Sequence, residues 1–420
     1  GEFGPSNEKP YFAADKNNFA PRVGLVWEIL GDQKLVARAG AGLTYGPPQP
    51  IFYYDQAFGD PRLPFLASFR PTDVPSSIDI SFPFPQSFVS QVIANPDLLP
   101  SNLVLSRSIT DFNREDEYAG QWNLSLQSAL TRTLAVQASY VGSRGLNLFT
   151  TRTINLKDPV TGLRPRPEFG DITYRENSAS SSYHALQLSV NKKIGFGLTT
   201  DFYYTYARSM QYGGADGTVT TDGTVQDYNN VAGSYGPKPG DVRRRFVNVY
   251  SYDIPTLPFV KESAIGRNIL AGWSFQGIIT WRSGLPLDIT AGDDLLENGR
   301  ATANRPDLVL GVNPYIKNAD GLTWLNPAAF DADTPDTENR YGTLGYNVFR
   351  GPSAFTYDAA LHKTFALTER QRLNFRFEMF NAFNHKVLSN PVTNLSNDNF
   401  GKIQNASFGR NIQFALKYVF

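Results

Sequence analysis

Residues 118–130 read YAGQWNLSLQSAL, and apolar and polar side chains alternate strictly through the middle of this stretch. Trp122, Leu124 and Leu126 fall on one side of an extended chain, and Asn123 falls on the other. Successive side chains of a β-strand point to opposite faces. The alternation therefore indicates a strand with one apolar face and one polar face.

The same alternation returns along the rest of the chain and predicts about eleven long strands, beginning with Phe19–Leu30. Most of them have about ten residues or more, the length that crosses a bilayer at a tilt. Strands of globular proteins are usually about five or six residues long. In two segments, Leu35–Tyr45 and Arg245–Ile254, the pattern leaves open which face is apolar. The clearest recurrences are Leu134–Tyr140, Leu186–Asn191, Asp201–Tyr206, Trp273–Trp281, Leu373–Met379 and Ile412–Phe420.

The connections between the predicted strands alternate between short and long. Outer-membrane barrels have short periplasmic turns and long extracellular loops. With the C-terminus on the periplasmic side, every connection falls on the expected side, so the sequence predicts an all-β fold, an antiparallel transmembrane β-barrel of the bacterial outer membrane. The short and medium connections are Gly31–Lys34, Arg132–Thr133, Gly195–Gly197, Leu257–Leu270 and Thr368–Gln371. The long ones are Gly46–Glu117, Asn147–Ser180, Gln211–Asp241, Ala291–Ala354 and Lys386–Ala406.

The odd number of predicted strands is unexpected, because bacterial single-chain barrels have an even number. We therefore expect residues 1–420 to be the C-terminal portion of an outer-membrane β-barrel domain, with the plug and N-terminal domains absent from this chain. If the chain supplies half of the barrel, the whole has about 22 strands, a size at which the lumen is plugged.

The composition argues against several other classes of protein. Lys plus Arg equals Asp plus Glu at 39 each, so no net charge draws the chain to nucleic acid. Without cysteine there is no disulfide framework, thiolate metal site or cysteine nucleophile. No apolar run reaches the roughly 18 residues of a transmembrane helix, and no nucleophile elbow, P-loop or HExxH motif appears. We expect neither an enzyme nor a bound cofactor.

Several short motifs follow one another along nearly the whole chain. Together they resemble the C-terminal barrel of TonB-dependent outer-membrane receptors, in particular the Oar-like group abundant in Acidobacteria. The motifs are Asn17–Gly24 with Gly31-Asp32 and Arg38–Gly40, Gly272-Trp273 with Gly277-Ile278 and Ser283–Pro286, Asn304–Asp307 with Trp324–Phe330 and Arg350–Pro352, and Phe380–His385 with Phe400-Gly401.

The resemblance implies energy-coupled uptake of a bulky solute, whose identity it leaves unknown. It also implies a plug domain, and a TonB partner that acts through an N-terminal region outside this chain. It carries no ligand-binding residue over to this sequence. The residues leave two other functions open: a passive porin or a surface-structural barrel with adhesive loops, and, more remotely, a soluble secreted all-β protein such as a carbohydrate-active enzyme.

The C-terminal strand ends in Phe420, which shares its face with Tyr418 and Leu416. The resemblance implies that this terminal aromatic residue is the signal read by the barrel-assembly machinery. The alternative is a strand that ends in phenylalanine without such a role.

Arg243, Arg244 and Arg245 stand where a long loop enters a strand. The barrel as a whole is expected to contact outer-membrane lipid. At the outer rim these arginines could also hold phosphate groups of lipopolysaccharide, because arginine binds phosphate through a bidentate pair of hydrogen bonds. Pairing with carboxylates of the lumen or loops is the favoured alternative.

Three other groups of residues carry weaker expectations. The histidines are too scattered to predict a metal or triad site, so strand or surface positions are expected. The acidic loop residues match no calcium-binding loop and are expected to be solvated. The loop aromatics either bind a sugar or peptide or close the barrel mouth, and both remain open. These groups are His184, His362 and His385; Asp293, Asp294, Glu297, Asp331, Asp333, Asp336 and Glu338; and Phe52, Tyr53, Tyr54, Phe65, Phe69, Phe82, Phe84 and Phe88.

Overall fold

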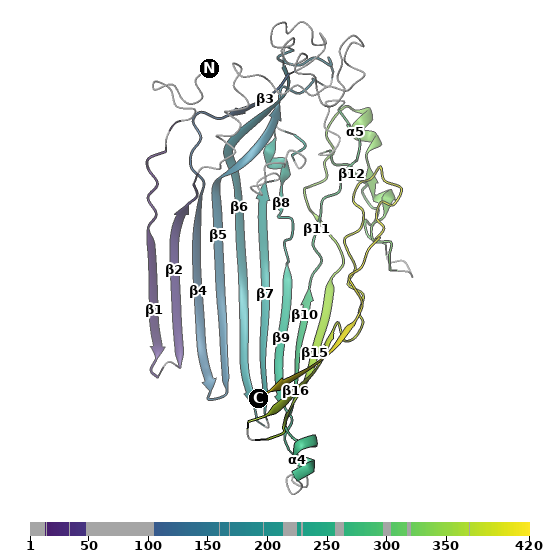
Figure 1. The fold of residues 1–420 in the computed structure, drawn as a ribbon. Helices are drawn as coiled ribbons and strands as arrows, with labels where there is room; N and C mark the ends of the chain where they lie inside the picture. Colours follow the sequence, from purple (N-terminus) through teal and green to yellow (C-terminus); the bar gives the residue numbers. More distant parts are fainter. Residues whose placement is uncertain are drawn as a thin grey trace, which may run out of the picture.

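One antiparallel sheet dominates the computed structural model (Figure 1). The structure describes residues 13, 15–32, 34–47, 105–158, 160–167, 169–195, 197–212, 225–227, 230–256, 264–296, 304–316, 321–368 and 370–420. The loop aromatics predicted between Phe52 and Phe88 lie outside these residues.

Eleven strands of the sheet follow one another in sequence order, as predicted from the alternation. Two shorter strands extend it beside this path: β3 (Leu105–Thr110) runs parallel to β6, and β8 (Tyr235–Pro237) pairs with β7. The eleven are β1 (Arg22–Leu30), β2 (Leu35–Tyr45), β4 (Tyr118–Thr131), β5 (Leu134–Ile154), β6 (Phe169–Ile194), β7 (Leu198–Tyr212), β9 (Arg244–Asp253), β10 (Trp273–Arg282), β15 (Ala354–Ala366), β16 (Arg372–Phe380) and β17 (Asn411–Val419).

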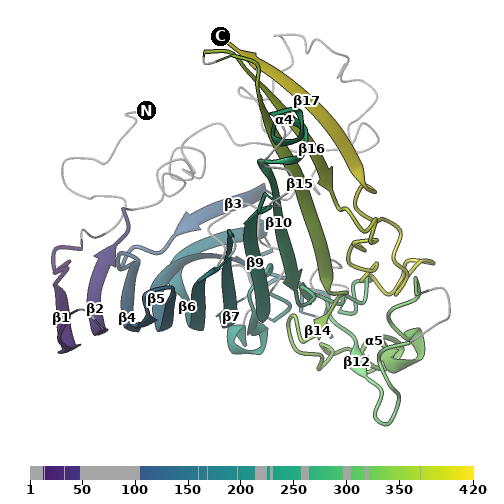
Figure 2. The ribbon, with the colours of Figure 1, turned by 90° about the horizontal axis from the view of Figure 1, so that it is seen from below.

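The sheet is a curved, open trough, as the view from below in Figure 2 shows. Strands β1 and β17 form its two edges, and no pairing joins them among the described residues. The predicted barrel is therefore not closed. The reason is geometric: in a run of eleven antiparallel neighbours the first and last strands point the same way, so they cannot form an antiparallel seam with each other.

The register assigns every spanning strand one apolar and one polar face. Leu124 lies opposite Ala39 and Tyr140, whereas Ser125 lies opposite Arg38 and Ser139. We call the face that carries Leu124 and its cross-strand partners the apolar face, and the opposite one the polar face. Leu124 is 55% exposed, and large apolar side chains on this face are widely exposed. Such an extended apolar surface is covered by lipid in membrane barrels.

Strand β9, whose facing the sequence left open, is fixed by its neighbours. Phe246 lies opposite Tyr204 and Trp281 on the apolar face. Arg245 lies opposite Thr205 and Arg282 on the polar face. The alternation was ambiguous because β9 also carries valines on its polar face.

Long connections gather at one end of the sheet and short ones at the other, where α4 (Ala264–Leu270) also lies (Figure 1). We call the end with the long connections the outer rim. No helix among the described residues is long and apolar enough to span a membrane.

The long loop predicted at Asn147–Ser180 is wrong. Strands β5 and β6 continue through it for 21 and 26 residues, and they remain paired up to Ile154 and Ile172. Register shifts between Gly145 and Leu148, and again before Phe149, interrupt the alternation of apolar and polar residues from which strands are predicted. The threonines that follow, such as Thr150, favour extended backbone.

Above the outer rim the long connections fold into a layer of their own, which we call the loop layer: residues 285–296, 304–316, 321–353 and 387–406. Its core holds Leu287, Leu325, Phe330, Phe349 and Phe400, each at most 9% exposed. The loop layer contains β11 (Pro286–Leu287), β12 (Asp307–Leu308), η4 (Pro327–Ala329), β13 (Phe330–Asp331), α5 (Asp333–Thr337) and β14 (Phe349–Arg350), and η3 (Val231–Ser234) lies against it.

Candidate ligand-binding surface at the outer rim

The loop layer is held by a well-packed aromatic core. The ring of Phe330 meets those of Phe349 and Phe400 edge-on, with centroids 5.5 and 5.4 Å apart. Leu325 beside them is fully buried. Edge-to-face aromatic pairs add to the free energy of burial. These connections therefore present a fixed surface above the sheet.

Arg305 anchors the loop layer to its surroundings. Its side chain is 1% exposed, Nε donates to the carbonyl of Leu344 at 2.9 Å, and Nη2 donates to the carbonyl of Gly233 at 3.1 Å. The guanidinium also lies 5.9 Å from the ring centroid of Tyr346. One side chain thus joins segments far apart in sequence through charge-assisted hydrogen bonds.

Asp288 shares this buried environment. Its Oδ1 is enclosed and accepts no hydrogen bond within the described residues. Burial raises the pKa of the Asp288 carboxyl to about 6, although the charge of Arg305 opposes the rise. An enclosed carboxylate with a single nearby cation is costly to keep charged.

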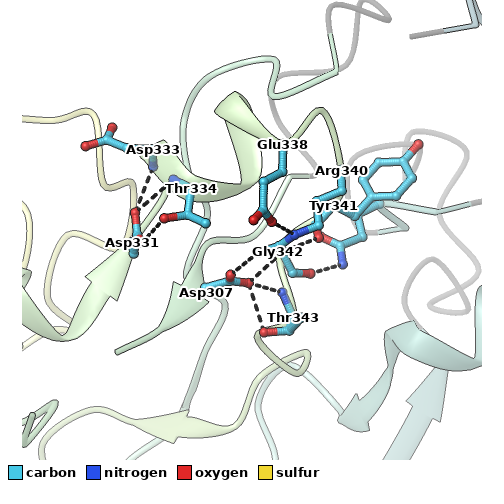
Figure 3. Close-up of polar contacts among 10 residues, drawn as sticks. Asp307, Asp331, Asp333, Thr334, Glu338, Arg340, Tyr341, Gly342 and Thr343 are labelled. Carbon is cyan, nitrogen blue, oxygen red and sulfur yellow. Dashed lines mark hydrogen bonds and ion pairs between the residues drawn. The ribbon is translucent and has the colours of Figure 1, made fainter. Parts of the chain in front are cut away.

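A second ion pair closes the outer part of the loop layer (Figure 3). Arg340 donates to both carboxylate oxygens of Asp307, at 2.6 and 3.2 Å, and to Glu338 at 2.5 Å. Thr343 donates to Asp307 through its backbone N and its hydroxyl, at 2.7 and 2.9 Å. The Arg340 hydrogen bond, followed by those from Thr343, lowers the pKa of Asp307 to about 2.

Replacing Asp307 by asparagine should cost the loop layer about 1–2 kcal/mol at pH 7, allowing for the partial exposure of Arg340. A carboxyl whose folded pKa lies below its unfolded value near 3.8 contributes stability above that value and loses it as the pH falls toward 2. Hydrogen exchange of loop-layer amides from pH 7 to pH 3 measures the effect, and Asp307→Asn should flatten the pH dependence. Asp333→Asn is the control, and an equal response there would contradict the prediction.

The predicted acidic cluster around Asp331 is partly structural. Asp331 accepts hydrogen bonds from the backbone N of Asp333 and Thr334, at 2.9 and 3.1 Å, and from the Thr334 hydroxyl at 2.7 Å, so it binds the first residues of α5. These bonds, the Thr334 hydroxyl first, lower the pKa of Asp331. Glu338 binds Arg340. Among the described residues no group of acidic or histidine side chains is arranged to hold a metal ion.

Asp241 ties the loop layer to the sheet. Its Oδ1 accepts the backbone N–H of Ser209 on β7 at 2.8 Å, and its Oδ2 accepts from Arg350 on β14. Arg350 also donates to the Asp241 carbonyl at 2.8 Å. The Asp241 side chain is 1% exposed. A buried carboxylate with several charge-assisted donors is a strong junction.

A pocket of about 450 Å³ opens on the polar face directly below this junction. Strand β6 contributes Tyr183 and Gln187, and the turn before β9 contributes Lys238. Strand β7 contributes Thr205, and β9 contributes Arg245. Cationic and hydrogen-bonding groups therefore face one cavity at the outer end of the trough.

The structure separates the three predicted rim arginines. Arg243 lies 3.8 Å from Asp241 (Nε to Oδ2), in the favoured arrangement with a loop carboxylate. Arg245 lines the pocket on the polar face. Arg244 is exposed and lies opposite Tyr206 on the apolar face.

The residues of the predicted assembly signal lie at or next to the end of β17. Leu416 and Tyr418 lie opposite Phe375 and Leu373 on the apolar face, and Phe420 follows the strand. All three are exposed, Phe420 by 90%.

The three histidines lie apart from one another. His184 accepts or donates a 2.7 Å hydrogen bond with the Tyr140 hydroxyl, depending on its tautomer. His362 lies 3.8 Å from Glu378. His385 packs edge-on against Phe355.

Sequence reasoning missed Arg305 and Asp241 as organising residues. Arg305 belongs to the motif Asn304–Asp307, which carried the family resemblance, but its partners lie 39 to 72 residues away. Nothing local in the sequence marks such distant contacts.

Comparison with known proteins decides the family. The sequence model described as an outer membrane beta barrel domain matches residues 2–413. The chain belongs to this outer-membrane β-barrel family. Its place is therefore the bacterial outer membrane, and the family is one of membrane barrels rather than enzymes. No curated protein sequence matches the chain.

The chain is also similar to several solved structures. The outer membrane transporter YddB from Escherichia coli shares 12% identity with a TM-score of 0.52, over 96% of this chain and 40% of YddB. The FrpB iron transporter from Neisseria meningitidis shares 9% identity with a TM-score of 0.45, over 96% of this chain and 39% of FrpB. The siderophore receptor PiuA from Acinetobacter baumannii shares 9% with a TM-score of 0.44, over 95% and 35%. The likeness to YddB shows a shared fold, and the chain spans less than half the length of each of these proteins.

Proposed function

We propose that this chain forms the C-terminal half of a barrel of about 22 strands, in an Oar-like TonB-dependent receptor that takes up a bulky solute. The observation that carries the proposal is the trough of eleven strands with one polar and one apolar face, topped by a folded loop layer. The 40% coverage of the YddB chain supports a larger whole.

The loop layer suits the capture of a solute. Its aromatic core and the buried Arg305 hold the surface in one arrangement, so binding does not have to order it. Ordering a mobile loop would oppose binding. In this proposal the solute meets the loop layer first and then the polar face of the trough. TonB, in the periplasm, binds the N-terminal region and thereby displaces the plug.

The conductance of planar bilayers separates this proposal from a passive porin. The complete gene product that carries residues 1–420 should give no steady ion conductance, because a plug fills its lumen. Deleting the residues of that plug should produce stepwise conductance. Steady conductance of the complete protein would overturn the proposal in favour of a porin.

We propose that Phe420, with Tyr418 and Leu416, forms the signal for the barrel-assembly machinery. Phe420→Ala should lower the fraction of folded protein in outer membranes several-fold, because a lipid-facing terminal side chain is lost. Phe408→Ala is the matched control, since Phe408 is 98% exposed but lies before the strand. The folded fraction is measured by heat-modifiable gel mobility, and equal behaviour of the two variants would refute the role.

We propose that Arg244, alone of the three rim arginines, contacts lipopolysaccharide phosphate. It is exposed on the apolar face at the outer end of β9, where the register places Tyr206 beside it. Arg244→Gln should reduce the lipopolysaccharide that copurifies with the protein, whereas Arg243→Gln should not, because Arg243 lies next to Asp241. Unchanged lipopolysaccharide content in Arg244→Gln would exclude the contact.

A further inference from the structure

We infer that the pocket on the polar face is an anion-binding subsite, in which the lining residues Arg245 and Lys238, with Arg282 on the strand next to Arg245, hold a carboxylate or phosphate group of the transported solute. The role in transport rests on the function proposed above, but binding of an anion does not. The subsite would give the solute a chemical class: it carries at least one oxyanion.

The pocket is built from side chains that the register brings to one face. Gln187 lies opposite Thr205, and Thr205 lies opposite Arg245. Arg245 in turn lies opposite Arg282 on β10. Directly opposite residues of an antiparallel pair have Cβ atoms about 5 Å apart. The side chains of Arg245 and Arg282 therefore leave the backbone at neighbouring positions at the outer end of the polar face.

The charges around this pocket do not balance. Asp241 lines the pocket together with the cations Lys238 and Arg245, and Arg282 lies opposite Arg245 in the register. The Asp241 carboxylate is already engaged, because it accepts from Ser209 and Arg350 and lies beside Arg243. Within the described part of the chain, no carboxylate pairs with Lys238, Arg245 or Arg282.

The next carboxylates on the polar face lie further down the trough. Asp201 lies opposite Val249, and Asp358 lies opposite Ile278. Each of these positions is four residues along its strand from the arginine pair, or about 13 Å at the usual rise. Asp201 accepts from Asn191, and Asp358 accepts from the backbone N of Asn381.

Like charges placed directly opposite each other destabilise a sheet. An oxyanion between Arg245 and Arg282 would relieve this repulsion and accept charge-assisted hydrogen bonds from both. The hydroxyls of Tyr183 and Thr205 and the amide of Gln187 offer further donors in the same pocket. The site therefore combines unpaired positive charge, hydrogen-bond donors and enough volume for a small multivalent anion.

Titration calorimetry on the complete gene product in detergent tests the subsite, with citrate as the carboxylate probe, pyrophosphate as the phosphate probe and sucrose as the neutral one. We expect citrate or pyrophosphate to bind, and the tighter of the two to identify the preferred oxyanion. Sucrose should not bind. Affinity should fall as salt is raised, because the contacts are ionic.

Arg245→Gln and Arg282→Gln should each weaken binding about tenfold, the loss of one charge-assisted contact. Arg208→Gln is the matched control: Arg208 is exposed on β7, lies opposite His184 on the apolar face, and should leave affinity within about twofold. Lys238→Gln, in the turn outside the spanning strands, gives a second test if a strand variant fails to fold.

Absence of binding by both anions, or an equal loss of affinity in Arg208→Gln, would overturn the subsite. The two proposals fail separately. If the protein conducts ions at rest but binds citrate through Arg245 and Arg282, the proposed receptor function is refuted and the anion subsite is supported. If the protein conducts no ions at rest and binds neither anion, the proposed receptor function stands and the anion subsite is refuted.

Discussion

Replacing Arg305 by alanine should unfold the loop layer and leave the spanning strands paired. The variant removes donors to the carbonyl of Leu344, the carbonyl of Gly233 and the hydroxyl of Ser234. It also leaves the enclosed carboxyl of Asp288 without its nearby cation. Breaking a buried charged network in this way costs about 3–5 kcal/mol, a large share of the roughly 5–15 kcal/mol that keeps an ordinary domain folded.

Hydrogen exchange read by mass spectrometry measures this outcome, because it reports the loop layer and the strands separately. Peptides from residues 304–316 and 321–353 should lose protection, and those from β4 and β7 should keep it. Arg305→Lys should also lose protection in the loop layer, since an ammonium group cannot reproduce the planar set of hydrogen-bond donors of a guanidinium. Arg340→Ala is the control within the layer: its side chain is 36% exposed, so water can replace its contacts and its loss should cost much less stability than the loss of Arg305. Equal effects of the two alanine variants would contradict the anchoring role.

Asp241→Asn should release the loop layer from the rim of the sheet without unfolding either part. The substitution keeps the shape of the side chain but leaves Arg350 and Arg243 without their shared carboxylate. Because the side chain is 1% exposed, solvent cannot take over this role, and the expected cost is about 3 kcal/mol.

The amide of Ser209 and the residues of β14 should then exchange faster, while the aromatic core around Phe330 stays protected. Asp398→Asn, an exposed change of the same chemistry elsewhere in the loop layer, should have no effect. If Asp241→Asn leaves the exchange of Ser209 and β14 unchanged, the junction at Asp241 does not hold the layer in place.

The sequence predicted the spanning strands well because their signal is local. A side chain such as Leu124 faces lipid or lumen according to its parity alone, and no distant residue needs to be known. Where the parity rule broke down the prediction failed, as at the bulges near Leu148 that hid the outer halves of β5 and β6. Strand β9 needed its neighbours, because only the register showed that Arg245 belongs to the polar face.

The rim surface could not be predicted because its contacts are long-range. Asp241 and Arg350 are 109 residues apart, and Arg305 and Gly233 are 72 apart. The three arginines singled out in the sequence each have a different environment. Arg244 and Arg245 face opposite sides because they are adjacent in a strand, and Arg243 precedes the strand. The distinction between a lipid contact, a pocket and an ion pair arises only when the sheet is assembled.

The open edges of the trough have a consequence for biogenesis. Along β1 and β17, every second residue directs its backbone N–H and C=O groups away from the sheet, where no described strand meets them. Hydrocarbon offers these groups no partner, and each one left bare there costs several kcal/mol. In the larger barrel proposed above, entry into the bilayer and pairing of both edges with further strands would therefore proceed together, so an assembly intermediate that exposes either edge would need shelter from lipid until its neighbours arrive.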